Sequence, residues 1–202
     1  RDNTGNSNNA SVSFSVATKN YITISQPSDN SVFNSSSIIL TVNAYDKAGS
    51  LGKVLYSLDN GSWTELGGSG TYTATISAIS KGAHQIKVQA MSGTGKLQDE
   101  VNFIIDTSLP TITLTSLVAD KKVTLTASAS DSDTNIGEVV FYASQNSEGK
   151  DITISTLTRA NNGSNYLVSW TPPKDGTYFI SAIAKDKAGN EGISNKITLT
   201  IN

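Results

Sequence analysis

The feature that most constrains the fold of this chain is a hairpin pattern that occurs twice, in residues 82–105 and 176–201. Each copy has two stretches with an apolar residue at every second position, separated by a turn that contains glycine. In the second copy these positions are Tyr178, Ile180, Ala182 and Ala184 before the turn, and Ile197, Leu199 and Ile201 after it. A period of two residues is typical of a half-buried β-strand, so each copy predicts an antiparallel hairpin.

Residues 1–17 repeat only the second half of this pattern, with Val12, Phe14 and Val16 on one face. Recurrence at this spacing predicts a tandem array. We expect an all-β fold of two tandem antiparallel β-sandwiches, in residues 18–106 and 107–202, with about seven strands each. We expect residues 1–17 to be the last turn and strand of a preceding, truncated module.

Composition excludes several classes of function. Hydrophobic residues make up 37% and aromatic residues 7% of the 202 residues, a profile that suits half-buried antiparallel sheets. The 15 lysines and arginines nearly balance the 17 acidic residues, so no basic field predicts nucleic acid as a partner. No apolar run approaches the ~20 residues that span a bilayer, so no membrane span is expected in this fragment.

The strongest local signal is Asp59-Asn60-Gly61-Ser62, because Asn-Gly tolerates the positive φ of a type I′ turn between two strands. We expect that turn to place Leu58 opposite Trp63 and to make Trp63 a packing residue. Trp170, at the end of another predicted strand, is expected to be buried in the same way.

Three segments of the sequence resemble those of a known group of domains. They are the linker Leu109-Pro110-Thr111-Ile112, the stretch 56–63 (YSLDNGSW), and the turn 186–190 (DKAGN). In these segments the chain resembles the Ig-like and fibronectin type III-like repeats of bacterial and archaeal surface and secreted proteins. The resemblance implies Ig-like sandwiches, an extracellular or cell-surface location, and roles that range from spacers, adhesin stalks and surface-layer units to accessory domains of secreted hydrolases.

No constellation of catalytic residues is found in the sequence. His84 is the single histidine and takes the position of Tyr178 in the repeat, where sandwiches often place a tyrosine that bonds back to the chain. Asp99 and Glu100 are adjacent and so point to opposite faces of a strand, which prevents them from acting as a catalytic pair. We therefore expect no enzyme and no required cofactor.

Two hypotheses for function remain. The first is a non-catalytic rigid spacer or assembly unit of a surface-layer or adhesin-like protein, with neighbouring repeats or cell-surface components as partners. The alternative is an accessory region of a secreted protease or glycoside hydrolase that binds polysaccharide. The alternative needs exposed coplanar aromatic rings, and Trp63 and Trp170 are the candidates.

Calcium is a candidate ligand at the junction between the two sandwiches. An Ig-type topology would bring Asp106 of the linker close to two turns of the second sandwich, and the expected carboxylates are those of Asp106, Asp131, Asp133 and Asp186. Without a lysine or arginine partner they would repel one another, and a cation would relieve that repulsion. In the other interpretation each aspartate caps its own turn by side-chain hydrogen bonds. The first sandwich has Asp46 but no acid in the matching turn at 92–95, so it should not bind.

A lone strand in residues 1–17 should pair with an unpaired sheet edge, in its own missing domain or in a neighbouring molecule. If it is a donor strand that completes a neighbouring subunit, a variant without residues 1–17 should lose self-association. Light scattering of the two proteins measures this, and an unchanged association state would exclude the donor strand.

Overall fold

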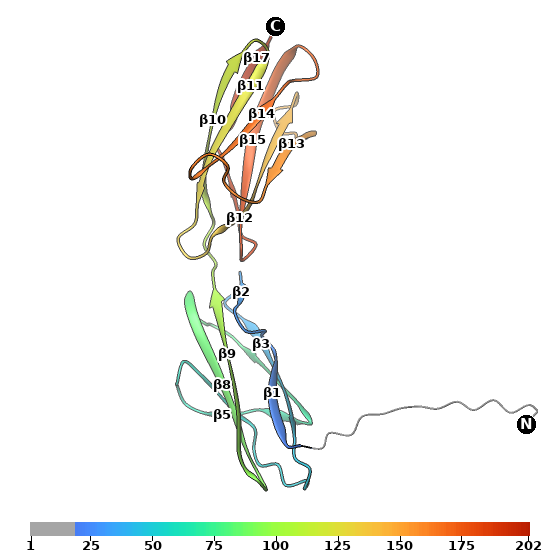
Figure 1. Ribbon diagram of the computed structural model, residues 1–202, viewed down its shortest axis with the longest axis vertical. Coiled ribbons are helices and arrows are strands. Elements are labelled where there is room, and N and C mark those ends of the chain that lie inside the picture. The colour runs from blue at the N-terminus through green and yellow to red at the C-terminus, as the bar shows by residue number, and fades with distance from the viewer. Residues whose placement is uncertain (1–18) are drawn as a thin grey trace, which may run out of the picture.

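The computed structural model describes residues 19–202, so the predicted strand in residues 1–17 lies outside the described residues. The described residues form two β-sandwiches joined end to end along the long axis of the molecule (Figure 1). In this part of the chain no helix is long and apolar enough to cross a membrane. The all-β, two-sandwich prediction is confirmed.

The first sandwich has two sheets, ordered β1-β3-β7-β6 and β2-β9-β8-β4-β5. Strand β2 runs parallel to β9, and the other pairs are antiparallel. The strands are β1 (Tyr21–Gln26), β2 (Ser31–Phe33), β3 (Ile38–Tyr45), β4 (Leu55–Leu58), β5 (Thr64–Glu65), β6 (Gly67–Ser69), β7 (Thr71–Ile76), β8 (Gly82–Ser92) and β9 (Gly95–Ile105). The predicted hairpin of residues 82–105 is the β8–β9 pair.

The second sandwich repeats this plan with sheets ordered β10-β11-β14 and β13-β12-β15-β16, where β17 also pairs with β15. Its strands are β10 (Thr111–Ala119), β11 (Lys122–Ser130), β12 (Ile136–Ser144), β13 (Ile152–Leu157), β14 (Asn165–Trp170), β15 (Gly176–Asp186), β16 (Glu191–Ile193) and β17 (Ile197–Ile201). The short strands β2, β6 and β16 were not expected, because segments of three residues have no readable periodicity.

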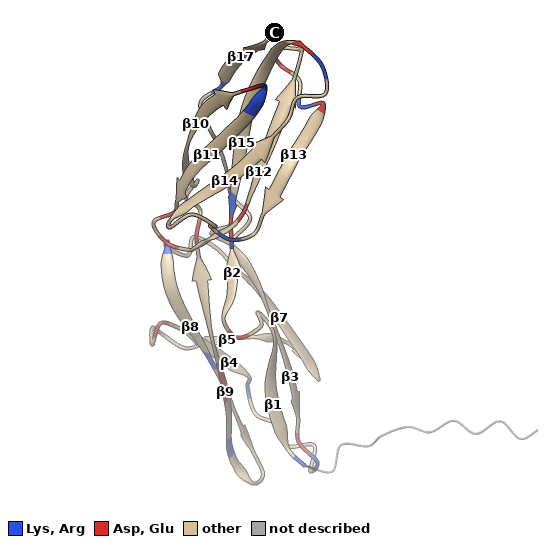
Figure 2. Ribbon diagram, turned by 45° about the horizontal axis from the view of Figure 1, so that its top comes forward, with Lys and Arg blue, Asp and Glu red and all other residues tan. Residues whose placement is uncertain are grey.

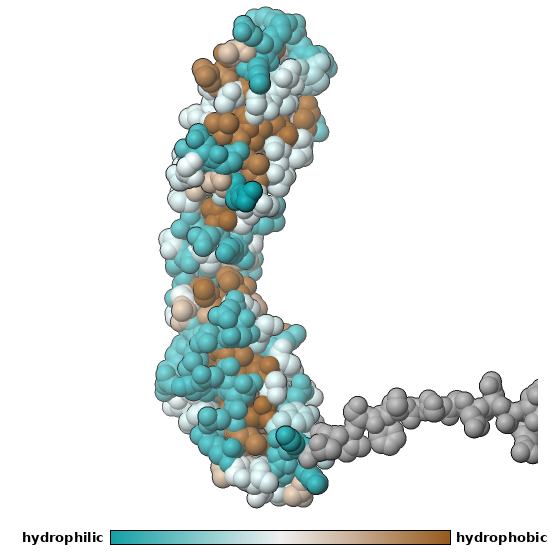
Figure 3. Space-filling view, in the orientation of Figure 1, coloured by the Kyte–Doolittle hydropathy of each residue, from teal (hydrophilic) through white to brown (hydrophobic). Residues whose placement is uncertain are grey.

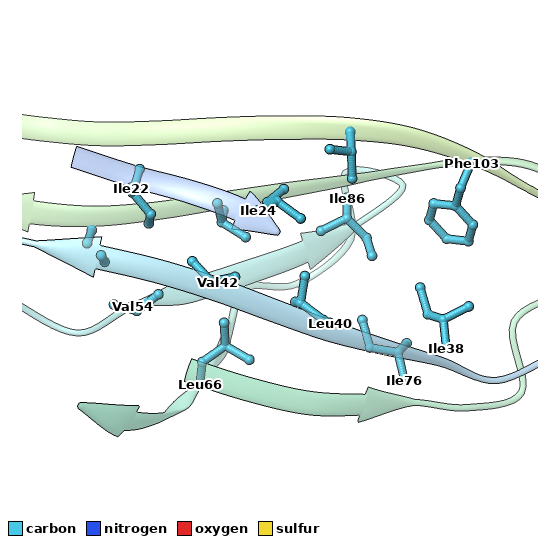
Figure 4. Close-up of a cluster of buried hydrophobic side chains, with 14 of the residues drawn as sticks. Ile22, Ile24, Ile38, Leu40, Val42, Val54, Leu66, Ile76, Ile86 and Phe103 are labelled. Carbon is cyan, nitrogen blue, oxygen red and sulfur yellow. The ribbon is translucent and has the colours of Figure 1, made fainter. Parts of the chain in front are cut away.

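Alternation along each strand produces the two cores. In β3, Ile38 and Leu40 are buried while Ile39 between them is 58% exposed. Figure 4 shows side chains of β1, β3, β8 and β9 meeting between the two sheets of the first sandwich. Full burial of such a side chain contributes about 1.5–3 kcal/mol to folding, so the interior of each sandwich is its main source of stability.

The hairpin between β4 and β5 differs from the prediction. Positive φ values occur at Asp59 (50°) and Asn60 (59°), so the turn is centred one residue before Asn-Gly. Tyr56 pairs with Thr64, whereas the predicted pairing of Leu58 with Trp63 would place Tyr56 opposite Glu65. Since side chains alternate between faces, this shift of one residue turns the indole away from the core, and Trp63 is 43% exposed. The prediction that Trp63 is a cross-strand packing residue opposite Leu58 is wrong.

The linker between the sandwiches is held close to the second one. The backbone of Pro110 passes so near to Gly192 of β16 that a Cβ at this glycine would lie 1.9 Å from the Pro110 carbonyl oxygen. No side chain fits in that space, so a glycine is required here. Together with the fixed φ of Pro110, this contact restricts how the linker can bend.

Replacing the two tryptophans by alanine should have unequal effects. Trp170 packs against the second core with its ring at 90° to that of the fully buried Tyr178, so Trp170→Ala should cost about 3 kcal/mol. Trp63→Ala should cost less than about 1 kcal/mol, because the ring lies on the surface. Chemical denaturation of both variants measures this, and a large loss for Trp63→Ala would contradict its exposed position.

Candidate metal centre at the domain junction

Asp106 is the first residue of the linker and is completely buried. Its backbone N–H donates to the Phe33 carbonyl at 2.8 Å, which ties the linker to the first sandwich. Its carboxylate reaches the second sandwich, where Oδ2 accepts a hydrogen bond from Thr134 Oγ1 at 2.7 Å. Oδ1 accepts from the N–H of Ser108 at 3.0 Å. Asp106 therefore forms hydrogen bonds to both sandwiches.

Asp131 begins the turn after β11. Its Oδ1 accepts hydrogen bonds from the N–H groups of Asp133 and Thr134, both at 2.9 Å, which is the turn-capping role that aspartate often has. Its Oδ2 is buried and has no hydrogen-bond partner among the described residues. A buried carboxylate oxygen without a partner is unfavourable, and such an atom needs an explanation such as a bound ion.

Asp186 ends β15 and is buried. Its Oδ1 accepts from the N–H groups of Gly189 and Asn190, and its Oδ2 accepts from Asn190 Nδ2 at 2.8 Å. The same Asn190 amide also donates to the backbone carbonyl of Asp106 at 2.8 Å. Asn190 therefore holds the Asp186 turn against the linker.

The carboxylates of Asp106, Asp131 and Asp186 each place one oxygen within 4.8 Å of the others. Two oxygens that bind one calcium at about 2.4 Å can lie at most about 4.8 Å apart, so these three atoms can share an ion. The second oxygens and the neighbouring amide and hydroxyl groups orient the carboxylates, as residues around metal ligands generally do. Figure 2 shows acidic segments gathered where the two sandwiches meet.

Asp133, the fourth predicted ligand, is engaged elsewhere. Its Oδ2 forms a salt bridge of 2.7 Å with Nζ of Lys81, from the end of the first sandwich, and accepts from Ser108 Oγ at 3.0 Å. The expectation that this group of carboxylates has no lysine partner is therefore wrong for Asp133. The hydrogen bond from the Lys81 ammonium holds the pKa of Asp133 below its usual value, and the same bond raises the pKa of Lys81.

The first sandwich provides a built-in comparison at Asp46, which follows β3 as Asp131 follows β11. Here Oδ2 accepts from Ser50 Oγ at 2.7 Å and from the N–H of Gly93 at 3.2 Å, and Oδ1 accepts from the N–H of Ala48. These hydrogen bonds, first the one from Ser50, lower the pKa of Asp46. Both oxygens are satisfied by the protein, whereas the equivalent Asp131 leaves one oxygen without a partner.

His84 has a structural position. Its Nε2 lies 2.7 Å from the carbonyl oxygen of Ser80, four residues earlier, and Tyr178 OH donates to the carbonyl of Lys174, also four residues earlier, at 2.9 Å. The histidine thus makes the backbone contact that the tyrosine makes in the other sandwich. Its Nδ1 lies 2.7 Å from Asp59 Oδ2 in the β4–β5 turn.

Sequence reasoning did not anticipate several residues at this junction. Lys81, Ser108 and Thr134 contribute to it, yet each is a common surface residue type in a turn or linker. Of these three, only Thr134 could have been predicted from the sequence. It follows the Asp-x-Asp sequence of residues 131–133, which favours a turn capped by a side chain.

Two β-sandwiches with this strand order define a pair of tandem Ig-like domains. The sequence profile described as bacterial Ig domain matches residues 21–88 and 104–182, and the chain belongs to that family. No curated protein sequence matched this chain.

Among solved structures, the fibronectin(III)-like modules of Clostridium thermocellum CbhA are similar, with 23% identity and a TM-score of 0.57 over 90% of this chain and 94% of theirs. That similarity supports the fold. Two others are the BSP domain of a biofilm-associated protein (15% identity, TM-score 0.31, 88% of this chain and 30% of that chain) and an endo-beta-1,4-mannanase from Thermotoga petrophila (12% identity, TM-score 0.40, 45% and 20%).

The Lys81–Asp133 salt bridge should make the junction sensitive to acid. Because the folded-state pKa of Asp133 lies below its unfolded value, its stabilising contribution is present above the unfolded pKa and is lost as pH falls through the folded pKa. Lys81→Met should raise the pKa of Asp133 toward its usual value and weaken this pH dependence.

Carboxyl NMR titration of Asp133 and thermal melts over a pH series measure both effects. Lys122→Met, which removes an exposed lysine at the far end of the second sandwich, is the matched control and should change neither. An unchanged Asp133 titration in Lys81→Met would contradict the assignment.

Proposed function

We propose that this pair of domains is a non-catalytic, semi-rigid spacer or assembly unit of a cell-surface protein, of the surface-layer or adhesin type. Membership of the bacterial Ig domain family supports an extracellular or surface-associated location. The surface in Figure 3 is elongated and mostly hydrophilic, with hydrophobic residues in separate groups. Its partners would be neighbouring repeats of the same protein or other cell-surface components.

The observation that carries this proposal is the bonded junction. Asp106 contacts both sandwiches, Lys81 of the first bonds to Asp133 of the second, and Asn190 bonds to the linker backbone. A flexible tether would have a solvated linker with few such contacts. In this linker the Asp106 carboxylate is buried and Pro110 packs on Gly192. Such a linker restricts the orientation of one domain relative to the other.

Calcium is proposed as the ion that completes the junction, held by Asp106, Asp131 and Asp186. The three carboxylates come from three separate segments, so an ion shared by them would join the linker to both turns of the second sandwich. Calcium accepts six to eight oxygens, and backbone carbonyls or water would fill the remaining positions. The unpartnered Asp131 Oδ2 supports this proposal, because the ion would satisfy that atom.

The ion should stabilise the second sandwich, since it binds only where the three loops are assembled. At a calcium concentration about 100 times its Kd, the expected gain is about 2.7 kcal/mol. Thermal melts in EDTA and in millimolar calcium measure the shift. Asp186→Ala should abolish it, whereas Asp46→Ala, the equivalent turn in the first sandwich, should keep it. A melt that is identical with and without calcium would leave these aspartates as turn caps.

Rigidity is measured independently of calcium binding by spin labels at Thr75→Cys and Thr156→Cys, one exposed position in each sandwich of a chain that contains no cysteine. A spacer predicts one narrow distance distribution between the labels, and Asp106→Ala should broaden it. A broad distribution in the parent chain, with calcium present, would contradict the spacer function.

A second candidate function, the accessory region of a secreted hydrolase, is favoured by one observation. Trp63 is 43% exposed, whereas a structural tryptophan would be buried. An exposed indole is a common element of ligand-binding surfaces, since it presents a large apolar area at low entropic cost.

A further inference from the structure

The outer face of the β8–β9 hairpin carries a row of polar cross-strand pairs. In β8, His84, Ile86, Val88 and Ala90 are buried, so the residues between them face solvent. The register places each of these directly opposite a polar residue of β9 on the same face. We name this surface the amide ladder, which consists of Gln85 with Asn102, Lys87 with Glu100, and Gln89 with Gln98.

Trp63 stands beside the amide ladder. It lines a shallow depression of about 500 Å³ together with Lys87, Gln89 and Gln98. The exposed indole and the amide groups therefore belong to one surface.

The depression at Trp63 is the middle one of three along the same hairpin. On one side, Gln85 and Asn102 line a depression of about 600 Å³, and on the other, Gln89 and Met91 line one of about 300 Å³. All three depressions are open to solvent. Strand β8 has 11 residues and so spans about 35 Å at ~3.3 Å per residue. A linear series of shallow sites suits an extended polymer better than a compact ligand.

The charged residues along this face are of both signs, with Lys53, Lys87 and Lys96 against Glu65, Asp99 and Glu100. Lys87 lies directly opposite Glu100, and its Nζ donates to Asn60 Oδ1 at 2.8 Å. Lys53 at the edge of the face forms a salt bridge with Glu65. Amide groups both donate and accept hydrogen bonds, as sugar hydroxyls do. The surface therefore favours an uncharged polar polymer over an acidic one.

We propose that the amide ladder and Trp63 bind an uncharged polysaccharide. The indole packs on the apolar C–H face of one sugar ring, and the glutamine and asparagine amides bond to hydroxyls of adjacent rings along the strand. This inference rests on the second candidate function and adds the surface and the ligand class. It is independent of the calcium centre, whose carboxylates lie at the junction.

The second sandwich lacks this pattern at the equivalent positions. Aligning Gly176 with Gly82 places Phe179, Ser181 and Ile183 where the first sandwich has Gln85, Lys87 and Gln89. The two sandwiches share the fold, but the second has no row of amide side chains at these positions. Binding is therefore assigned to the first sandwich, and the second serves as an internal control.

Native gel electrophoresis of the whole chain through gels that contain a soluble β-glucan, a xylan or a galactomannan tests this proposal. We expect retardation by at least one of these neutral polymers and none by polygalacturonate. Trp63→Ala should weaken the apparent affinity about tenfold. The double variant Gln89→Ala/Gln98→Ala tests the amides separately, and Leu117→Ala, at a residue of the second sandwich that is 68% exposed, should bind like the parent chain.

Three results would overturn the proposal. They are the absence of retardation by every neutral polymer, equal retardation of Trp63→Ala and the parent chain, and retardation by polygalacturonate alone that disappears with salt. A protein partner on this face would give the first result. Any of these outcomes leaves the spin-label and calcium measurements unaffected, so failure here is distinguishable from failure of the spacer function.

Discussion

The arrangement of the two sandwiches depends on how one buried carboxylate, that of Asp106, is satisfied. Burying an ionised carboxylate costs several kcal/mol unless hydrogen bonds or a counter-charge compensate. In this chain the carboxylate is compensated by the Ser108 N–H within the linker and by the Thr134 hydroxyl of the second sandwich, while the Asp106 N–H bonds to the Phe33 carbonyl of the first sandwich. A large rotation of one sandwich against the other would strain the bonds that Asp106 makes to Phe33 and Thr134. The buried charge therefore couples the orientation of the domains to the geometry of the turns.

The two domains differ in how they satisfy the carboxylate of the aspartate that follows the equivalent strand. After β3, the Asp46 carboxylate is satisfied by a serine hydroxyl and backbone N–H groups, so that turn is complete without any other group. After β11, the Asp131 carboxylate faces two further acids and keeps one oxygen unpartnered. Two copies of one fold can thus differ in the chemistry of a single turn, which illustrates that function resides in sites placed on folds and not in the folds themselves.

The outer faces of the sandwiches have diverged in a similar way. The inward positions of β8 and β15 are constrained by the core and remain apolar or, as in His84 and Tyr178, repeat the same backbone contact. The outward positions carry no packing constraint, and there the first sandwich has amides where the second has Phe179 and Ile183. Differences on a solvent-facing sheet surface are therefore better indicators of binding than differences inside.

The sequence by itself determined the strands and the sandwich class, because a period of two residues with glycine-bearing turns leaves one buried face per strand. It also predicted that Asp106, Asp131 and Asp186 lie close together, because an Ig topology places their loops at the same end of the second sandwich. Only the tertiary structure decided that Lys81 pairs with Asp133 and that Trp63 faces solvent. The first depends on how two domains meet, and the second on a one-residue shift in a hairpin. Long-range contacts and turn register are set by packing of the whole molecule, and local patterns do not encode them.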